Sequence, residues 1–287
     1  MLPYQVEIFT CFDRRLVMKG SVVGSAAGTV TLHLGEDVFQ VPVAHDGERL
    51  HFDFRTMIST DQPWEGHLVV TDGGSVWRVD HLYQAVEPAH LLYPHFLSML
   101  EGQGDFLEIG ARARSGISRR DAVPDGWNYT GFDIIAGENV DVVGDAHQLS
   151  RHFDQKFDAV MALSVLEHIL MPWKMIVELN RVMKPGGIGF FLTHQGWPVH
   201  DAPWDFWRFS DQSWRALLNA ATGFEIIEAR MGEPTFVVPQ RLHPVNAFGM
   251  GQYSYLVSSV LFRKVGDTTL DWPVEVADIT ATHYPES

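Results

Sequence analysis

The sequence predicts an α/β domain whose Rossmann-like, mostly parallel sheet carries helices on both faces, preceded by a small all-β module. Two patterns support this prediction. Residues 1–88 hold short β-branched and aromatic runs and no segment of helical periodicity. From residue 105 onward, strand-like runs alternate with helical segments, which is typical of a parallel α/β sheet. A chain of 287 residues is long enough for two such domains.

The amino-terminal module, residues 1–88, is predicted from six runs in which apolar and polar residues alternate, as they do in strands with one buried face. We expect a β-sandwich or barrel-like accessory module that packs on a catalytic domain or builds a homo-oligomer. Capture of a glycan or substrate is the alternative. The runs are VEIFTCF, TVTLHLG, VFQVPVA, RLHFDF, GHLVVTDGG and VWRVDHLYQAV.

The second domain, residues 89–287, begins with a bridging helix at about 88–101, which Gly102 and Gly104 end. Further helices are predicted in LEHILMPWKMIVELNRVMK and in SDQSWRALLNAA, the latter behind an N-cap at Ser210. Ligands of such sheets bind at the carboxyl ends of the strands, so chemistry is expected there. The predicted strands are DFLEIG, NYTGFDII, FDAVMAL, GGIGFFLTH, GFEIIEAR and YSYLVSSVLFRK.

Composition excludes several classes of protein. Hydrophobic residues make up 46% and charged residues 20%, which is typical of a folded chain. No run approaches the roughly 20 apolar residues of a membrane-spanning helix, and the first residues lack the order of a secretory signal. A net charge of −15 disfavours nucleic acid as a partner. Cys11 is the single cysteine, so an intramolecular disulfide is excluded and a cytoplasmic protein is expected.

Three strand ends carry small or acidic residues. Glu108 and Gly110 end the first strand of the second domain, where a small residue lets backbone N–H groups approach a ligand. Asp133 ends the next strand, where a carboxylate accepts hydrogen bonds from ribose hydroxyls. Asp145 can read an adenine amino group, while Ala146 leaves space for the ring. Alone, the stretch with Glu108 and Gly110 also fits a plain structural turn and Asp133 a solvated aspartate at a strand end, but the three sites together predict a site for an adenosine ligand.

With these motifs the chain resembles the class I S-adenosylmethionine-dependent methyltransferases, specifically the type 11 group. The resemblance covers about residues 88–265 and rests on EIG, GFD, GDA, SVLEH and ELNRVMKPGG. It implies S-adenosylmethionine as the cofactor. By this resemblance Glu108, Gly110 and Ala111 would approach its methionine part, Asp133 its ribose with Ile134 alongside, Asp145 and Ala146 its adenine, and Ser164 would face the reacting methyl group.

The loop after Gly110 departs from the family pattern. Arg112 and Arg114 replace small residues there, and only SGISRRDAVPDG remains for the helix that should follow. Arg112 is therefore predicted in the cofactor site, where it would reach a carboxylate of the cofactor or substrate. The two arginines also leave open an alternative class, a catalytically inactive methyltransferase-like binding or scaffolding protein.

The segment THQGWPVHDAPWDFWRFSDQSW follows the fifth strand, where a methyl acceptor would enter. It resembles an H-x-x-P-x-D-x-x-R-F segment of methyltransferases from polysaccharide and natural-product gene clusters. A hydroxyl acceptor needs a base near its proton, and His200 is predicted for this role, with His194 as second choice and Asp205 to orient one of them. Substrate contacts are predicted at Trp204, Trp207 and Arg208, and at Met250 and Tyr253 in a lid-like segment.

Two other interpretations of this segment stay open. Asp205, Trp207 and Arg208 would form a structural network that ties the loop to the domain. Alternatively a divalent ion would bind His194, His200, Asp201 and Asp205, but their spacing matches no closed zinc pattern, and no metal is predicted. His168 is assigned a structural or pocket-floor role. The function predicted overall is methyl transfer to an oxygen of a small molecule or sugar, with a histidine removing the acceptor's proton.

Overall fold

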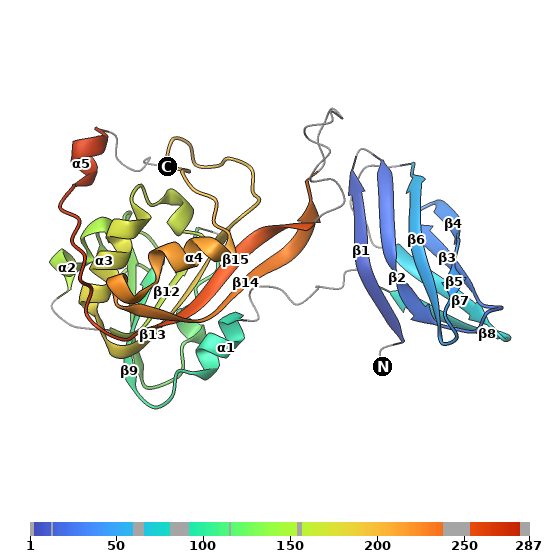
Figure 1. Ribbon diagram of the computed structural model, residues 1–287, viewed down its shortest axis with the longest axis horizontal. Helices are drawn as coiled ribbons and strands as arrows, with labels where there is room; N and C mark the ends of the chain where they lie inside the picture. The colour runs from blue at the N-terminus through green and yellow to red at the C-terminus, as the bar shows by residue number, and fades with distance from the viewer. Residues whose placement is uncertain are drawn as a thin grey trace. The chain divides into compact units, whose positions relative to one another are not determined.

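The computed structural model describes residues 3–12, 14–59, 66–80, 92–114, 116–153, 157–237 and 253–281. Contacts divide the chain into two units, residues 1–86 and 87–287 (Figure 1). Among the described residues, no helix is long and apolar enough to cross a membrane.

The first unit consists of two four-stranded antiparallel sheets, ordered β1-β2-β6-β5 and β4-β3-β7-β8. Inward-facing residues of both sheets, such as Met18 and Leu32, share one hydrophobic core, so the all-β prediction is confirmed. The strands are β1 Tyr4–Phe12, β2 Arg15–Val23, β3 Thr29–Leu34, β4 Asp37–Val41, β5 Ala44–His45, β6 Arg49–Met57, β7 Gly66–Asp72 and β8 Ser75–Asp80.

Strand β2 was not among the predicted runs. Its sequence RLVMKGSVV contains Gly20, which normally weakens a strand. A side chain at Gly20 would meet the backbone oxygen of Gln5 on β1 at 2.3 Å. The glycine therefore permits close approach of two strands, a requirement that local sequence does not reveal.

The second unit contains a seven-stranded sheet ordered β11-β10-β9-β12-β13-β15-β14. All neighbours are parallel except β15, which runs antiparallel to both β13 and β14. The mostly parallel sheet is thereby confirmed. Its strands are β9 Gly104–Ile109, β10 Trp127–Asp133, β11 Val142–Val143, β12 Phe157–Leu163, β13 Met183–His194, β14 Phe224–Phe236 and β15 Tyr253–Lys264.

Helices cover both faces of this sheet, as predicted. On one face, Phe96 of α1 packs with Phe106 and Phe190. On the other, Ile176 of α3 and Trp214 of α4 join a second core. The helical elements are α1 Leu92–Ser98, η2 Arg120–Ala122, η3 Ala146–Gln148, α2 Leu149–His152, η4 Leu166–His168, α3 Pro172–Val182, α4 Asp211–Leu217, η5 Ala220–Thr222 and α5 Val276–Ile279.

Two helix predictions need correction. The bridging helix ends earlier than predicted, because α1 spans Leu92–Ser98 and residues 99–101 are not helical; residues 88–91 lie outside the described part of the chain. The helix expected after β9 does not form within 110–114 and 116–126, where the short turn η2 is the one helical element. The reason is that this stretch contains Gly116 and Pro124, which disfavour a helix, and offers no continuous apolar face.

Candidate functional site

A cavity of about 400 Å³ lies at the carboxyl ends of β9, β10, β11 and β12. Its volume is in the range of small-molecule sites. The loops after these strands all contribute to its wall, together with the segment that follows β13. Of the predicted site residues, it is lined by Gly110, Arg112, Asp133, Ile134, Asp145, Ala146, Ser164, His200 and Trp204.

Gly110 shapes the loop that closes the cavity after β9. Its φ of +77° lies in the left-handed region, and an added Cβ would stand 2.1 Å from Cγ2 of Val165. The N–H groups of Gly110 and Ala111 both donate to the carbonyl of Phe132, at 2.8 and 3.1 Å. Ala111 is buried against this turn and does not line the cavity. Glycine is thus required at position 110 both for the left-handed backbone conformation and because a side chain would collide with Val165.

Glu108 lies behind the cavity wall and does not line it. Its side chain is 2% exposed and accepts a hydrogen bond from the hydroxyl of Tyr129. Burial raises the pKa of this carboxyl, against the opposing effects of Tyr129 and of Arg119, whose Nη1 is 3.8 Å from Oε1. In this structure the side chain of Glu108 therefore does not reach the cavity in which the methionine part of the cofactor was predicted to contact it.

Asp133 stands at the end of β10 with both oxygens facing backbone donors. Oδ2 accepts from the N–H of Arg112 at 3.2 Å, and Oδ1 accepts from the N–H of Ile135 at 3.0 Å. These bonds fix the carboxylate at the cavity wall, where its remaining lone pairs can accept from a diol. The next residue, Ile134, is 42% exposed and also lines the cavity.

Asp145 is held by its neighbour His147. Oδ1 accepts from the backbone N–H of His147 at 2.9 Å and lies 2.6 Å from Nδ1 of the same residue. Because Nε2 of His147 accepts from the N–H of Met171 at 3.1 Å, the ring proton must be on Nδ1. Burial alone would raise the pKa of Asp145, but these hydrogen bonds outweigh it and keep that pKa below its ordinary value. Oδ2 is left to accept from a ligand.

His200 also lines the cavity. Its Nδ1 lies 3.2 Å from the carbonyl oxygen of Pro198 and 3.1 Å from Oδ2 of Asp205. Both neighbours accept hydrogen bonds, so Nδ1 carries the proton and Nε2 keeps a basic lone pair. Arg208 donates to both oxygens of Asp205, from Nη1 to Oδ1 at 2.5 Å and from Nη2 to Oδ2 at 2.8 Å. This guanidinium holds the pKa of Asp205 far below its ordinary value.

His194 lies behind His200 and does not line the cavity. Its ring stacks on Trp197 at 4.8 Å between centroids, and its Nε2 is 3.2 Å from Oε1 of the fully buried Glu167. Burial lowers the pKa of His194 more than the Glu167 carboxylate raises it. His194, the second choice for the base, is therefore less well placed for that role than His200, which lines the cavity.

The aromatic segment after β13 divides into lining and anchoring residues. Trp204 is 5% exposed and lines the cavity. Trp207 instead donates from Nε1 to the carbonyl of Ile169 at 2.9 Å, and Arg208 donates to three backbone carbonyls of the segment. Neither lines the cavity. Met250 lies outside the described residues, as does the side chain of Tyr253.

Several cavity residues were missed by the sequence reasoning. Arg114 donates to both oxygens of Asp201, at 2.5 and 3.3 Å, across 87 positions of sequence. His168, for which the sequence predicts a structural or pocket-floor role, donates from Nδ1 to the carbonyl of Trp204 at 2.6 Å and lines the cavity. The other missed lining residues include Ile117, Arg119, His147, Ile169 and Val276.

The four residues considered for a metal are not gathered in one group among the described residues. Both oxygens of Asp205 bind Arg208, and those of Asp201 bind Arg114, so cations of the chain already stand at these carboxylates. Ligand atoms within 4.8 Å of one another occur in two other sets, Glu167 with His194 and His200, and His168 with His200 and Asp201.

Residues 107–191 match the family model described as a methyltransferase domain. This match confirms, for residues 107–191, the resemblance to methyltransferases that the sequence motifs carry. No curated protein matches the chain in sequence.

Solved structures with a similar fold include a putative methyltransferase from Bacillus halodurans, at 16% identity and a TM-score of 0.44, over 59% of this chain and 98% of that one. Another is a 1,6-didemethyltoxoflavin N1-methyltransferase from Burkholderia thailandensis with bound S-adenosylhomocysteine, at 14% identity and a TM-score of 0.44, over 60% and 76% of the two chains. A third is a [4+2]-cyclase, at 19% identity and a TM-score of 0.43, over 61% and 82%.

Proposed function

We propose that this methyltransferase domain transfers the methyl group of S-adenosylmethionine to an oxygen of a small molecule or sugar, with His200 as the base. The observation that carries the proposal is the continuity of one cavity. It is lined by Asp133 and Asp145, by Ser164 and by His200. Groups suited to an adenosine and a group suited to remove a proton thus share one space.

The residues present fit the cofactor. Asp145 and Ala146 would receive the adenine and Asp133 the ribose. Nε of Arg112 is buried and has no hydrogen-bond partner among the described residues. Because a buried donor without a partner is unfavourable, and Arg112 lines the cavity beside Gly110, a carboxylate such as that of the methionine part would satisfy it.

The reaction needs one proton acceptor. The bound cofactor supplies a methyl group on a sulfonium, whose leaving thioether needs no acid. Nε2 of His200 would take the hydroxyl proton of the acceptor as its oxygen bonds to the methyl carbon, and the electron pair of the broken C–S bond would stay on sulfur. Asp205 and the carbonyl of Pro198 hold Nδ1–H in place, so the ring presents its lone pair to the acceptor.

Oxygen is favoured over nitrogen by this base. A neutral amine attacks through its own lone pair and needs no prior deprotonation, whereas a hydroxyl becomes a good nucleophile as it loses its proton. An imidazole held in one tautomer at the cavity wall is therefore most useful to a hydroxyl acceptor. Trp204 provides an apolar wall beside it, which suits a sugar or another small ring.

The non-catalytic alternative is less well supported. Arg112 and Arg114 replace small residues in the loop, yet the cavity beside them stays open, and Arg114 pairs with Asp201. The role of the β module as an accessory unit, and a place in natural-product or polysaccharide synthesis, remain predictions from the sequence.

The test is release of S-adenosylhomocysteine with a panel of sugar, phenol and amine acceptors. Replacing Asp133 with Ala should abolish cofactor binding in calorimetry. His200→Ala should lower turnover by about 100-fold or more and leave cofactor affinity unchanged, with His51→Ala in the β module as the control. Retained turnover in His200→Ala rejects the base, and wild-type protein that transfers no methyl group to any acceptor class counts against the function.

A further inference from the structure

A carboxyl-terminal strap, residues 265–276, runs from the end of β15 along α3 to the cavity (Figure 1). At the carboxyl end of α3, the side-chain oxygen of Asn180 accepts from the N–H of Thr268 at 3.0 Å. One residue further, Nη2 of Arg181 donates to Oδ1 of Asp271 at 2.6 Å. The strap is outside the segment that matches the methyltransferase family model, which ends at residue 191.

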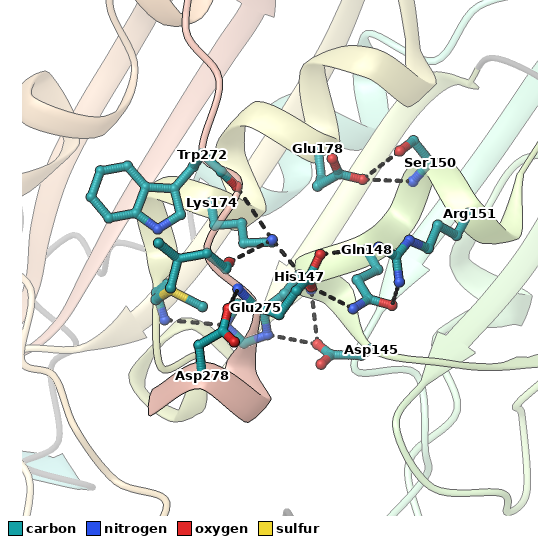
Figure 2. A network of polar contacts seen from close by, with 12 residues as sticks. Asp145, His147, Gln148, Ser150, Arg151, Lys174, Glu178, Trp272, Glu275 and Asp278 are labelled. Carbon is teal, nitrogen blue, oxygen red and sulfur yellow. Dashed lines mark hydrogen bonds and ion pairs between the residues drawn. The ribbon is translucent and has the colours of Figure 1, made fainter. Parts of the chain in front are cut away.

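Lys174, near the amino end of α3, is a buried anchor of the strap. The residue is 4% exposed, and its Nζ donates to the carbonyl of Val274 at 2.7 Å and to that of Trp272 at 3.3 Å (Figure 2). Nζ also lies 3.3 Å from Oε2 of Glu275. A buried ammonium is costly unless it is paired, and all three of these partners belong to the strap. Lys174 therefore serves to hold the strap on α3.

Glu275 connects the strap to the turn that carries the predicted adenine residues. Its Oε2 accepts from Nε2 of Gln148 at 2.6 Å, and its Oε1 accepts from Nη2 of Arg151 at 3.0 Å (Figure 2). Gln148 ends η3, the turn that begins directly after Asp145. The strap is thus bonded both to α3 and to the cavity wall.

These anchors place Val276 on the cavity. It is the first residue of α5 and lines the same space as Asp145, Ala146 and His147. Asp145 offers Oδ2 to a hydrogen-bond donor in the plane of a ring, because Oδ1 is already occupied by His147. A planar base bound there needs apolar contacts on its faces, which a valine side chain can supply.

We propose that the strap completes the adenine subsite, with Val276 contacting the base and Lys174 acting as a positioning residue. The inference rests on the proposed function for the identity of the cofactor. It assigns recognition of the purine base in part to Val276, which lies more than 80 residues beyond the end of the segment that matches the family model.

The experiment measures dissociation constants of S-adenosylhomocysteine and adenosine by calorimetry, and the melting temperature without ligand. Val276→Ala should weaken both ligands by a similar factor, about tenfold, because two methyl groups leave the base. Lys174→Met should weaken both ligands several-fold and raise KM for S-adenosylmethionine with kcat unchanged. Leu270→Ala is the matched control, because Leu270 is 46% exposed on the same strap and does not line the cavity.

Unchanged affinities in Val276→Ala, or a lowered melting temperature with unchanged affinities in both variants, would overturn the proposal. An affinity loss for S-adenosylhomocysteine but not for adenosine would also overturn it, since the contact would not be to the base. Wild-type protein that binds S-adenosylhomocysteine but transfers no methyl group refutes the proposed function alone. Wild-type protein that binds neither ligand refutes both proposals.

Discussion

Replacement of Asp205 by Asn separates two roles of the buried pair that this residue forms with Arg208. The side chain of Asp205 is fully buried, and both oxygens accept from the guanidinium. Oδ2 also accepts from the backbone N–H of His200 at 2.8 Å. Whichever way the amide of Asn is turned, its NH₂ group faces a donor. The substitution therefore removes the negative charge and leaves at least one N–H without its acceptor.

The magnitude follows from these contacts. A hydrogen bond to a charged group contributes about 1.5–3 kcal/mol, and breaking a buried ion pair costs about 3–5 kcal/mol. The side chain of Arg208 is 26% exposed and keeps its bonds to the carbonyls of Trp197 and Pro198, so the lower part of the range applies. We expect Asp205→Asn to lower the free energy of unfolding by about 2–3 kcal/mol.

Turnover should also fall, by about 100-fold, which is near the lower end of general-base contributions. The fall is limited because the carbonyl of Pro198 still accepts from Nδ1–H of His200 and preserves part of the tautomer preference. Urea unfolding followed by tryptophan fluorescence gives the stability. Nitrogen shifts of ¹⁵N-labelled histidine report the His200 tautomer, with His200→Asn to assign its signal and Asp125→Asn as an exposed control.

The two readouts can disagree, and each disagreement refutes a different step. A stability loss below about 1 kcal/mol would contradict the assignment of a buried, mutually dependent pair. A full stability loss with unchanged turnover and unchanged His200 shifts would leave Asp205 with a structural role and no part in orienting the base.

Two further predictions concern the β9 loop and acid stability. Gly110→Ala should prevent binding of S-adenosylhomocysteine, measured by calorimetry. It should also lower the free energy of unfolding by about 3 kcal/mol, because the backbone of Gly110 is left-handed and an added Cβ would lie 2.1 Å from Val165. Gly186→Ala is the control, because its φ is also positive but nothing lies within 4 Å; equal losses in both variants would contradict the contact argument. Burial lowers the pKa of His194 in the folded protein below its ordinary value of 6.5. Between these two pKa values the unfolded chain binds more protons than the folded one. The free energy of unfolding should therefore fall as the pH decreases from 6.5 to the lowered pKa of the folded state. Urea unfolding at about pH 7.5 and about pH 5.5 measures this slope, and His194→Gln should reduce it; an equal slope in wild type and variant would contradict the shift.

The strands could be predicted because their signals are local. Runs such as FDAVMAL and YSYLVSSVLFRK are rich in β-branched, aromatic and other apolar residues, and both form strands over the predicted residues. The antiparallel direction of β15 and the close packing around Gly20 depend on contacts distant in sequence. No local pattern reveals them.

The same distinction applies to the site. Gly110, Asp133 and Asp145 follow the ends of strands, so the topology alone brings them to one edge of the sheet. The pair of Arg114 with Asp201 joins two loops 87 positions apart, and no spacing rule predicts it. Trp207 was predicted from composition, and composition does not say which way a side chain faces.

The two interpretations of the Asp205 and Arg208 network, structural tie and orientation of the base, do not exclude each other. The guanidinium keeps Asp205 ionised, and the same carboxylate meets both the backbone N–H and Nδ1 of His200. A network that fixes the loop therefore also fixes the ring. The substitution of Asp205 tests whether the second effect matters for the reaction.

In the proposed reaction the positive charge moves from the sulfonium to the imidazole of His200, so the total charge of the site does not change. Oδ2 of Asp205 lies 3.1 Å from Nδ1 of that imidazole, but Arg208 lies within 2.8 Å of both oxygens of Asp205 and offsets much of their field. Asp205 should then act mainly by fixing the tautomer and less by stabilising the imidazolium. This is the physical reason to expect a hundredfold loss in Asp205→Asn, about the smallest effect of a general base, and a larger one in His200→Ala.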